Sequence, residues 1–235
     1  MANFQTHVTT STVLGVGYAG AGIVLNAPID SALIAGGLCG ISGMLPDVDS
    51  SSGRPIREIM NFAAAVVPML MIERMRHLGL TPESMVLAGG IMYLLVRFVF
   101  ADWLRRYTVH RGMFHSIPAA LIFAELGFLV CGCDNLQLRY YKAGAVFLGV
   151  MSHLLLDEIY SLQMYRGRLR LKKSFGTALK FWGDSTWANV STYAKLIAVT
   201  AMVLGEPLVM EKLGAPVHHD IYTTANQMLD TVIRR

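Results

Sequence analysis

Seven apolar segments occupy most of this chain, and they restrict its fold more than any other feature. Only 15% of the residues are charged, whereas soluble domains contain roughly 25%. A helix satisfies its own backbone hydrogen bonds in lipid, so apolar segments of this kind predict membrane helices. We expect an all-α, polytopic membrane helical bundle with about five to seven apolar helices. The segments cover residues 13–27, 32–45, 59–72, 85–101, 117–133, 140–156 and 195–213.

Several segments are shorter than the ~20 residues that cross a bilayer comfortably, so some are expected to be tilted, re-entrant or packed inside the bundle. The alternative is a soluble all-α protein with an unusually apolar core. No Pro/Gly/Ser-rich linker divides the chain, which predicts one membrane-embedded domain over residues 1–235. The start, MANFQTHVTT, has no basic region. We therefore expect no cleaved signal peptide and insertion through the internal segments.

The placement of basic residues predicts the orientation. If all seven segments cross, twelve Lys and Arg residues lie on the side of the N-terminus and seven lie on the other side. This excess places the first side in the cytoplasm, although Arg74 and Arg76 lie on the wrong side for that rule. The prediction is a multi-pass protein of the inner, cytoplasmic membrane.

Residues that can bind metal recur at the ends of the apolar segments, in the motifs LPDVD, HRGMFHS and SHLLLDE. Polar groups beside apolar segments are costly unless they are paired or coordinated. The same count of segments puts all of these residues on one side. The sequence thus predicts a polar metal site at the cytoplasmic membrane face, with candidate ligands His7, Asp47, Asp49, His110, His115, His153 and Asp157.

Each group of candidates has an alternative explanation. His153 and Asp157 are four residues apart and share a helix face, so they bind one ion, bridge two, or form only a His–Asp hydrogen bond. Asp47 and Asp49 follow a proline, and either both are ligands, or one of them supports a ligand or caps a turn. His7 is the weakest candidate alone, because it lies in a polar tail.

His110 and His115 are five residues apart, so an unbroken helix would not point them to one place. A turn at Gly112 between them would allow both to reach the site, although either one alone fits a structural histidine. Ser116 and Pro118 are typical of a helix start immediately after this turn.

These motifs together resemble a known family. A THxxT-like start followed in order by LPDVD, HRGMFHS and GVMSHLLLDE is similar to the YdjM-like, or LexA-binding, inner-membrane-associated predicted metal-dependent hydrolases, over roughly residues 6–160. The resemblance implies a multi-helix inner-membrane protein with a His/Asp metal site. It carries over the seven candidate ligands, with Arg111 and Ser116 beside them. A remoter similarity to zinc-dependent phospholipase C and P1 nuclease suggests phosphoester chemistry, but their full ligand pattern is not present.

The ligand types indicate the chemistry. Several His and Asp residues without a nearby cysteine favour zinc, with manganese or iron as alternatives, and permit one or two ions. A bound ion lowers the pKa of water to about 7 and polarises a phosphoryl or acyl oxygen. We assign catalytic roles to Arg111, whose guanidinium suits a phosphate or carboxylate, and to Glu158 as a general base. The alternatives are an Arg111–Asp pair and a solvated helix end at Glu158.

The functional hypothesis is a membrane-bound metal-dependent hydrolase that cleaves a phosphoester or other ester of a lipid or amphiphile. The alternative is a non-enzymatic protein, either a divalent-metal carrier or a helical partner of a membrane complex. The expected partners are membrane lipids and an anionic lipid or phosphoester substrate. A net charge of +4 is too small to indicate nucleic acid.

Two further polar features each have more than one interpretation. The basic run RGRLRLKK at 166–173 is expected to be a cytoplasmic loop, with a short hairpin or a headgroup-binding segment as alternatives. Arg97 and Glu125 lie within apolar segments, where they either pair with each other or extend the polar site.

Overall fold

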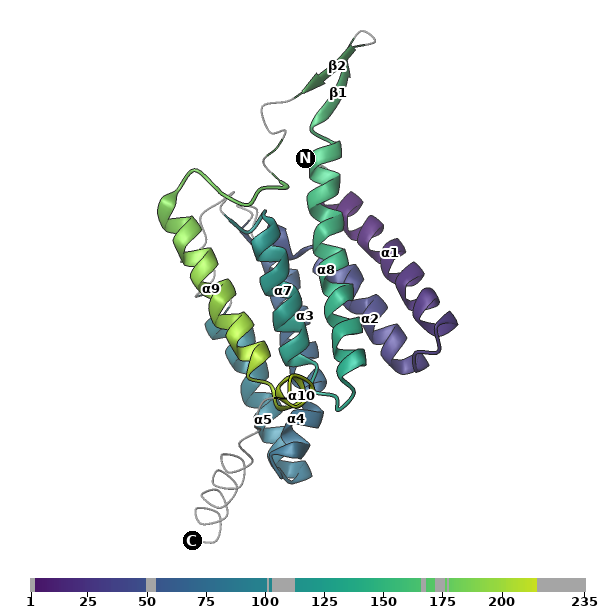
Figure 1. Cartoon of the computed structure of the whole chain (residues 1–235), viewed down its shortest axis with the longest axis vertical. Helices are drawn as coiled ribbons and strands as arrows, with labels where there is room; N and C mark the ends of the chain where they lie inside the picture. Colours follow the sequence, from purple (N-terminus) through teal and green to yellow (C-terminus); the bar gives the residue numbers. More distant parts are fainter. Residues whose placement is uncertain are drawn as a thin grey trace.

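The computed structural model describes residues 3–49, 54–100, 102, 113–165, 168–171, 176 and 178–214, and it shows a helical bundle (Figure 1). The prediction of an all-α membrane bundle is confirmed, with one small β-hairpin added. The elements are α1 (Phe4–Val24), α2 (Ile29–Ser42), the 3-10 helix η1 (Leu45–Asp49), α3 (Arg54–Leu70), α4 (Ile72–His77), α5 (Pro82–Leu94), the π-helix η2 (Leu95–Phe100), α7 (Ile117–Val130), α8 (Leu136–Ile159), β1 (Leu162–Tyr165), β2 (Arg168–Leu171), α9 (Thr186–Leu204) and α10 (Pro207–Lys212).

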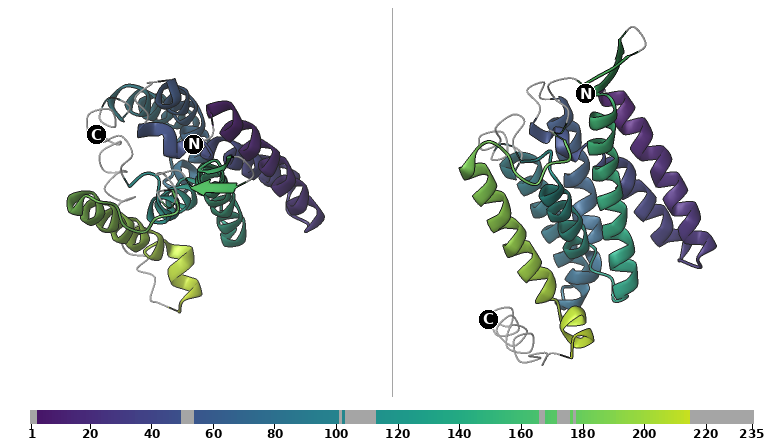
Figure 2. Two further views of the ribbon diagram at one scale, coloured as in Figure 1. Left: turned by 90° about the horizontal axis from the view of Figure 1, so that it is seen from above. Right: turned by 45° about the horizontal axis from the view of Figure 1, so that its top comes forward.

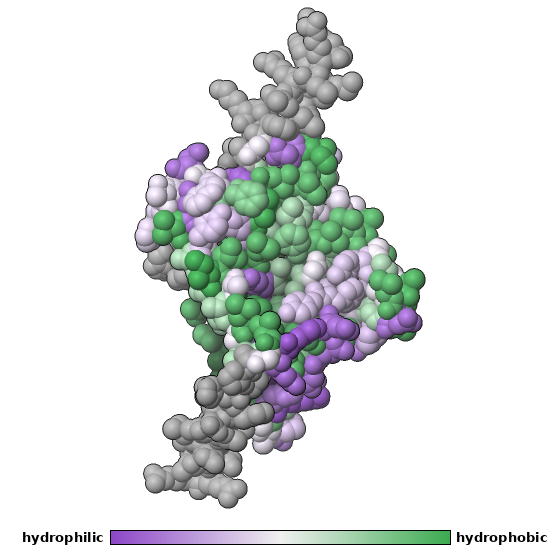
Figure 3. Space-filling view, in the orientation of Figure 1, coloured by the Kyte–Doolittle hydropathy of each residue, from purple (hydrophilic) through white to green (hydrophobic). Residues whose placement is uncertain are grey.

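Most of the described residues in each of the seven apolar segments lie on helices. Within the described part of the chain, three stretches are long and apolar enough to cross a membrane, namely Ile29–Asp47, Pro82–Phe100 and Thr186–Leu204. None of the Pro82–Phe100 window is buried inside the protein, and Val86 on α5 exposes 75% of its surface. Apolar surface also covers much of the face in Figure 3. Large exposed apolar surfaces suit lipid rather than water, which disfavours the soluble alternative.

Helix α8 lies at the centre of the bundle and packs against α1, α2 and α7, while α9 packs on α7. Figure 2 shows the same order from above, with α1 on one side of α8 and α9 on the other. The C-terminal end of α8 leads into the β-hairpin. This central position lets residues at the end of α8 meet residues from several other helices.

Small residues bring α1, α2 and α8 unusually close together. A Cβ atom on Gly15 would lie 2.3 Å from the carbonyl oxygen of Gly36, and one on Gly149 would lie 2.2 Å from that of Cys39. The Ser11 hydroxyl donates a hydrogen bond to the Gly40 carbonyl at 2.6 Å. Close backbone approach through small residues is typical of membrane helix packing. It fixes the relative depth of the three helices.

Part of the basic run at 166–173 forms one strand of a hairpin, while its cytoplasmic side stays a prediction. Strands β1 and β2 pair antiparallel, with Leu162 opposite Leu171 and Tyr165 opposite Arg168. Alternation of basic and apolar residues fits a strand, whose side chains point to opposite faces in turn. The hairpin alternative is therefore the correct one for the described part of this run.

The suggested pairing of Arg97 with Glu125 is wrong. The Thr200 hydroxyl donates to Glu125 Oε1 at 2.7 Å, whereas the Arg97 guanidinium lies over the Phe98 ring, 5.4 Å from its centroid. The reason is topological, because α7 packs against α9 while η2 packs against α3 and α5. The interhelical hydrogen bond to Glu125 therefore comes from α9, and it reaches only Oε1 of the carboxylate.

The segment predicted at 195–213 is not one helix. Helix α9 begins earlier, after the cap Ser185, and ends at Leu204. Helix α10 then starts at Pro207. Between them Glu206 accepts ion pairs from Arg74 at 2.9 Å and from Arg139 at 2.6 Å. Arg74 therefore takes part in a partly buried group of ion pairs with Glu206 and Arg139.

Candidate metal centre

The end of α8 supplies the first two residues of the site. His153 and Asp157 share one face of the helix, as predicted, and both are buried. Their nearest N–O distance is 3.7 Å, which is too long for the direct hydrogen bond that was the alternative explanation. The two side chains therefore face the same space without bonding to each other.

A backbone carbonyl fixes the His153 ring. Its Nδ1 lies 2.7 Å from the carbonyl oxygen of Gly43, the residue that ends α2. A carbonyl oxygen only accepts, so Nδ1 carries the proton and donates. In the neutral ring the lone pair is then on Nε2, which is buried and has no hydrogen-bond partner among the described residues. Ligating histidines are typically oriented in this way.

His7 comes from inside α1 and not from a polar tail. Asn3 caps this helix by accepting a hydrogen bond from the Thr6 amide at 2.8 Å, so α1 starts before the apolar segment does. The His7 ring stacks on His153, with centroids 3.6 Å apart. Its Nε2 lies 3.2 Å from Asp157 Oδ1. His7 thereby holds one oxygen of this carboxylate and leaves the other to face the remaining residues.

Asp47 and His115 close the site from two other elements. Asp47 lies in η1, directly after α2, and His115 immediately precedes the α7 cap Ser116. The Ser116 hydroxyl accepts from the Ala119 amide at 3.3 Å, and Pro118 lies in the first turn, as the sequence predicted. These local signals begin α7 at the depth where η1 and the end of α8 lie.

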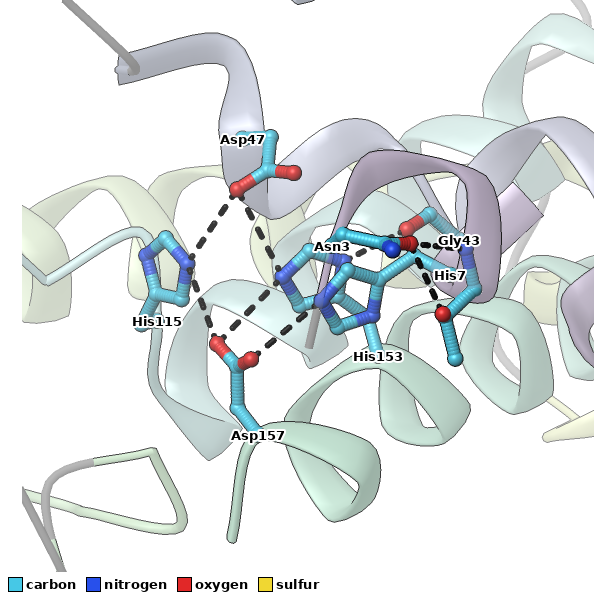
Figure 4. Close-up of polar contacts among 8 residues, drawn as sticks. Asn3, His7, Gly43, Asp47, His115, His153 and Asp157 are labelled. Atoms are coloured by element: carbon cyan, nitrogen blue, oxygen red, sulfur yellow. Dashed lines mark hydrogen bonds and ion pairs between the residues drawn. The ribbon is translucent and has the colours of Figure 1, made fainter. Parts of the chain in front are cut away.

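Four ligand atoms alternate around one point, as Figure 4 shows. Asp47 Oδ1 lies 3.8 Å from His115 Nε2 and 3.7 Å from His153 Nε2. Asp157 Oδ2 lies 3.9 Å and 3.7 Å from the same two nitrogens. Two ligands that bind one zinc ion at 2.0–2.2 Å in tetrahedral geometry are roughly 3.3–3.6 Å apart. The observed spacings are slightly longer, so a small inward movement of these side chains would let them share a divalent cation.

The charges of the site favour a cation as well. Two carboxylates face three imidazoles, and the Asp157 side chain is only 3% exposed. A buried carboxylate is costly unless it is paired or coordinated. Asp47 is the more open member, with a side chain 25% exposed. The centre is thus closed on the side of α8 and more accessible on the side of η1.

Among the residues that the structure describes, two possible metal-binding groups of three residues share His153. One contains His7 and Asp157, and the other contains Asp47 and His115. Since Nδ1 of His153 is held by Gly43, its remaining nitrogen can bind only one ion. Such sharing fits one ion in the four-atom ring, with His7 supporting Asp157, better than two independent ions.

The other predicted site residues are placed as follows. His110 and Arg111 lie outside the described residues, and so does the side chain of Asp49. The Glu158 side chain binds a residue outside the metal centre, because its Oε1 accepts a hydrogen bond from the Gly176 amide. Their roles stay predictions. The sequence analysis missed the carbonyl of Gly43, for which no sequence signal exists.

The sequence of the chain matches a model of a known protein family. A model of the family described as YdjM inner membrane protein matches residues 1–202. The chain belongs to the YdjM inner membrane protein family. The match includes all five residues gathered at the metal centre, and it confirms the YdjM resemblance and the inner-membrane location. No curated protein and no solved structure was found to match the chain.

Proposed function

We propose that this YdjM-family protein is a membrane-bound metal-dependent hydrolase that cleaves a phosphoester or other ester with a metal-activated water. One observation carries the proposal. The unprotonated Nε2 of buried His153 faces an oxygen of Asp47 and an oxygen of Asp157, each at 3.7 Å. Three lone pairs that face one another repel unless a cation or a proton lies between them.

The residues divide into ligands and a support. Asp47, His115, His153 and Asp157 would hold the ion, with zinc the first choice and manganese or iron next, since all of the donors are imidazole or carboxylate. His7 would orient Asp157 through its Oδ1 contact of 3.2 Å. The bound ion supplies a water of lowered pKa and polarises the oxygen of the ester. Arg111, if it reaches the site, would bind the anionic group of the substrate.

The position of the ligands favours an enzyme over a carrier. His7 lies in the first turns of α1, His153 and Asp157 lie in the last turns of α8, and Asp47 follows the end of α2. A carrier is expected to hold its ion near the middle of the membrane with access from both sides. Among the described residues, the possible metal-binding groups lie at one end of the bundle only.

The proposed orientation places this end in the cytoplasm in a multi-pass arrangement. Arg74 and Arg139, which weaken the positive-inside count, are held by Glu206 in a clamp at the other end. Basic residues that are held in ion pairs inside the protein indicate its orientation in the membrane less well than unpaired basic residues in loops do. Without them the basic excess on the metal side is larger.

Metal content and hydrolysis on the same samples test the proposal. Purified protein should contain about one divalent ion per chain, and it should cleave some member of a panel of phospholipids and soluble phosphoesters in a chelator-sensitive way. His153→Ala and Asp157→Ala should lose both properties. His77→Ala is the matched control, because His77 is 54% exposed and pairs with Asp134.

Three outcomes would count against this function. Full metal content in both His153→Ala and Asp157→Ala would show that these residues are structural. A normal metal load without hydrolysis across the panel would favour the alternative of a carrier. Complete absence of metal from the unmutated protein, even after incubation with zinc, manganese or iron, would exclude both the hydrolase and the carrier.

A further inference from the structure

An apolar groove runs along the inside of the bundle between α2, α3, α7 and α8. Its volume is about 190 Å³, and no charged side chain of the described residues lines it. Such a groove needs an apolar occupant, because water inside it would find few hydrogen-bond partners. In a membrane protein, the candidates are lipid chains and the apolar part of a substrate.

One end of the groove lies beside the metal centre. Two of its lining residues are Ser42, which directly precedes Gly43, and Leu45, two residues after it, and the Gly43 carbonyl holds His153. Leu45 also packs on the buried cluster around Ile59, together with Phe114, the residue before His115. The groove and the centre therefore share walls, and a molecule in the groove would place its upper end near Asp47 and His115.

The length of the groove corresponds to one leaflet. Ile59 and Leu70 both line it, and they are eleven residues apart on α3. At 1.5 Å per residue they are about 16 Å apart. The hydrocarbon core of one leaflet is about 15 Å thick, half of the ~30 Å of the whole bilayer. An extended chain that starts at the metal centre would thus reach the far end of the groove near the bilayer midplane.

We infer that this groove binds the acyl chain of the substrate, which makes the substrate a membrane lipid with an ester or phosphoester near its headgroup. The inference rests on the proposed hydrolase function. In the reaction, water adds across the ester bond: its oxygen bonds to the phosphorus or acyl carbon, the bond to the leaving oxygen breaks, and that oxygen takes a proton. The chain stays in the groove while the bond lies at the metal centre.

The effect of the substrate's acyl-chain length on activity tests this inference separately from the hydrolase proposal. Each CH₂ buried in the groove should raise kcat/KM about fourfold, until the chain reaches the end of the groove. A series of synthetic esters and phosphoesters with increasing chain length, offered as monomers dissolved in water so that each added CH₂ leaves water for the groove, should therefore show a rise and then a plateau. Hydrolysis without any dependence on chain length would overturn the inference and leave the hydrolase proposal intact.

A pair of variants on α3 tests whether the acyl chain binds in this groove. Ala63 lines the groove, whereas Ala65 does not and is exposed. Ala63→Phe should fill the part of the groove that lies farther from the metal centre, so the plateau should move to shorter acyl chains. Metal content and turnover of the shortest substrates should not change. Ala65→Phe should behave like the unmutated protein. An identical chain-length profile in both variants would contradict the inference.

A binding measurement that needs no hydrolysis separates the two proposals. A phospholipid with a photoactivatable diazirine in its acyl chain should cross-link to groove residues such as Val66 and Phe123, and less so in Ala63→Phe. Cross-links confined to the outer surface of α5 and α9 would refute the groove, whatever the activity. Groove cross-links in a protein that binds no metal would refute the hydrolase function, and with it the assignment of the occupant as substrate.

Discussion

The Nδ1 atom of His153 lies 2.7 Å from the carbonyl oxygen of Gly43. This contact joins the end of α8 to the end of α2 and decides which imidazole nitrogen faces Asp47 and Asp157. The backbone of Gly43 must stay where it is for this to hold, and Ser11 of α1 limits its position. A Cβ atom on Gly43 would lie 2.4 Å from the Ser11 side chain.

Gly43→Ala should therefore weaken metal binding without removing a ligand. The added methyl group must push α2 away from α1, which moves the carbonyl that orients His153. Loss of such a supporting contact typically lowers metal affinity 10–100-fold. Zinc titration of the purified variant measures this. Gly37→Ala is the control, since a Cβ atom there meets nothing within 4 Å. Equal affinities in the two variants would show that the Gly43 contact does not orient the ring.

His7 and His153 should differ in their effect on the metal. His153→Ala removes a ligand and should abolish stoichiometric zinc, whereas His7→Ala removes only the partner of Asp157 Oδ1 and should lower affinity about 10–100-fold. Metal analysis after dialysis against graded chelator concentrations separates the two. A complete loss of zinc in His7→Ala would indicate that His7 is itself a ligand and would favour the group of His7, His153 and Asp157.

Arg111→Lys should lower turnover more than metal content. Lysine keeps the charge but lacks the planar fork that binds a phosphate or carboxylate through two hydrogen bonds. We expect normal zinc and a reduced kcat/KM for an anionic substrate. Arg57→Lys is the comparison, because the Arg57 side chain is 57% exposed and pairs with its neighbour Glu58. Loss of zinc in Arg111→Lys would instead indicate a structural Arg111–Asp pair.

Glu206→Gln should destabilise the protein strongly while leaving the metal centre intact. The change leaves Arg74 and Arg139 without their carboxylate, and Arg139 is buried. Breaking a buried ion pair costs about 3–5 kcal/mol, so Tm in detergent should fall by several degrees. Glu73→Gln is the matched control, because its pair with Arg76 is exposed and such pairs contribute less than about 1 kcal/mol. Zinc bound at low temperature should be normal in both variants.

Reporter fusions test the proposed orientation. Fusions after positions 135, 175 and 235 should give an external, a cytoplasmic and an external signal, since the metal end carries the larger number of basic residues. A cytoplasmic signal at 135 together with an external signal at 175 would reverse the orientation and move the metal centre to the other face. A cytoplasmic signal at 235 alone would indicate that one segment is re-entrant.

The sequence by itself determined the helices and the chemistry of the site. Apolar segments, the Ser116–Pro118 helix start and the i,i+4 spacing of His153 and Asp157 are local properties, so they can be recognised without a partner. The ends of the segments also indicated the side on which Asp47 and His115 would lie. Counting segments was enough for this, because a membrane helix reverses the side of the chain each time it crosses.

Only the tertiary structure decided which groups meet and how. Every residue has a carbonyl, so nothing in the sequence marks that of Gly43 as the acceptor for His153. The depth of His7 depends on the close glycine contacts between α1 and α2, and the partner of Glu125 depends on which helix packs on α7. These are relations between distant segments, fixed by packing of side chains that no local pattern reveals.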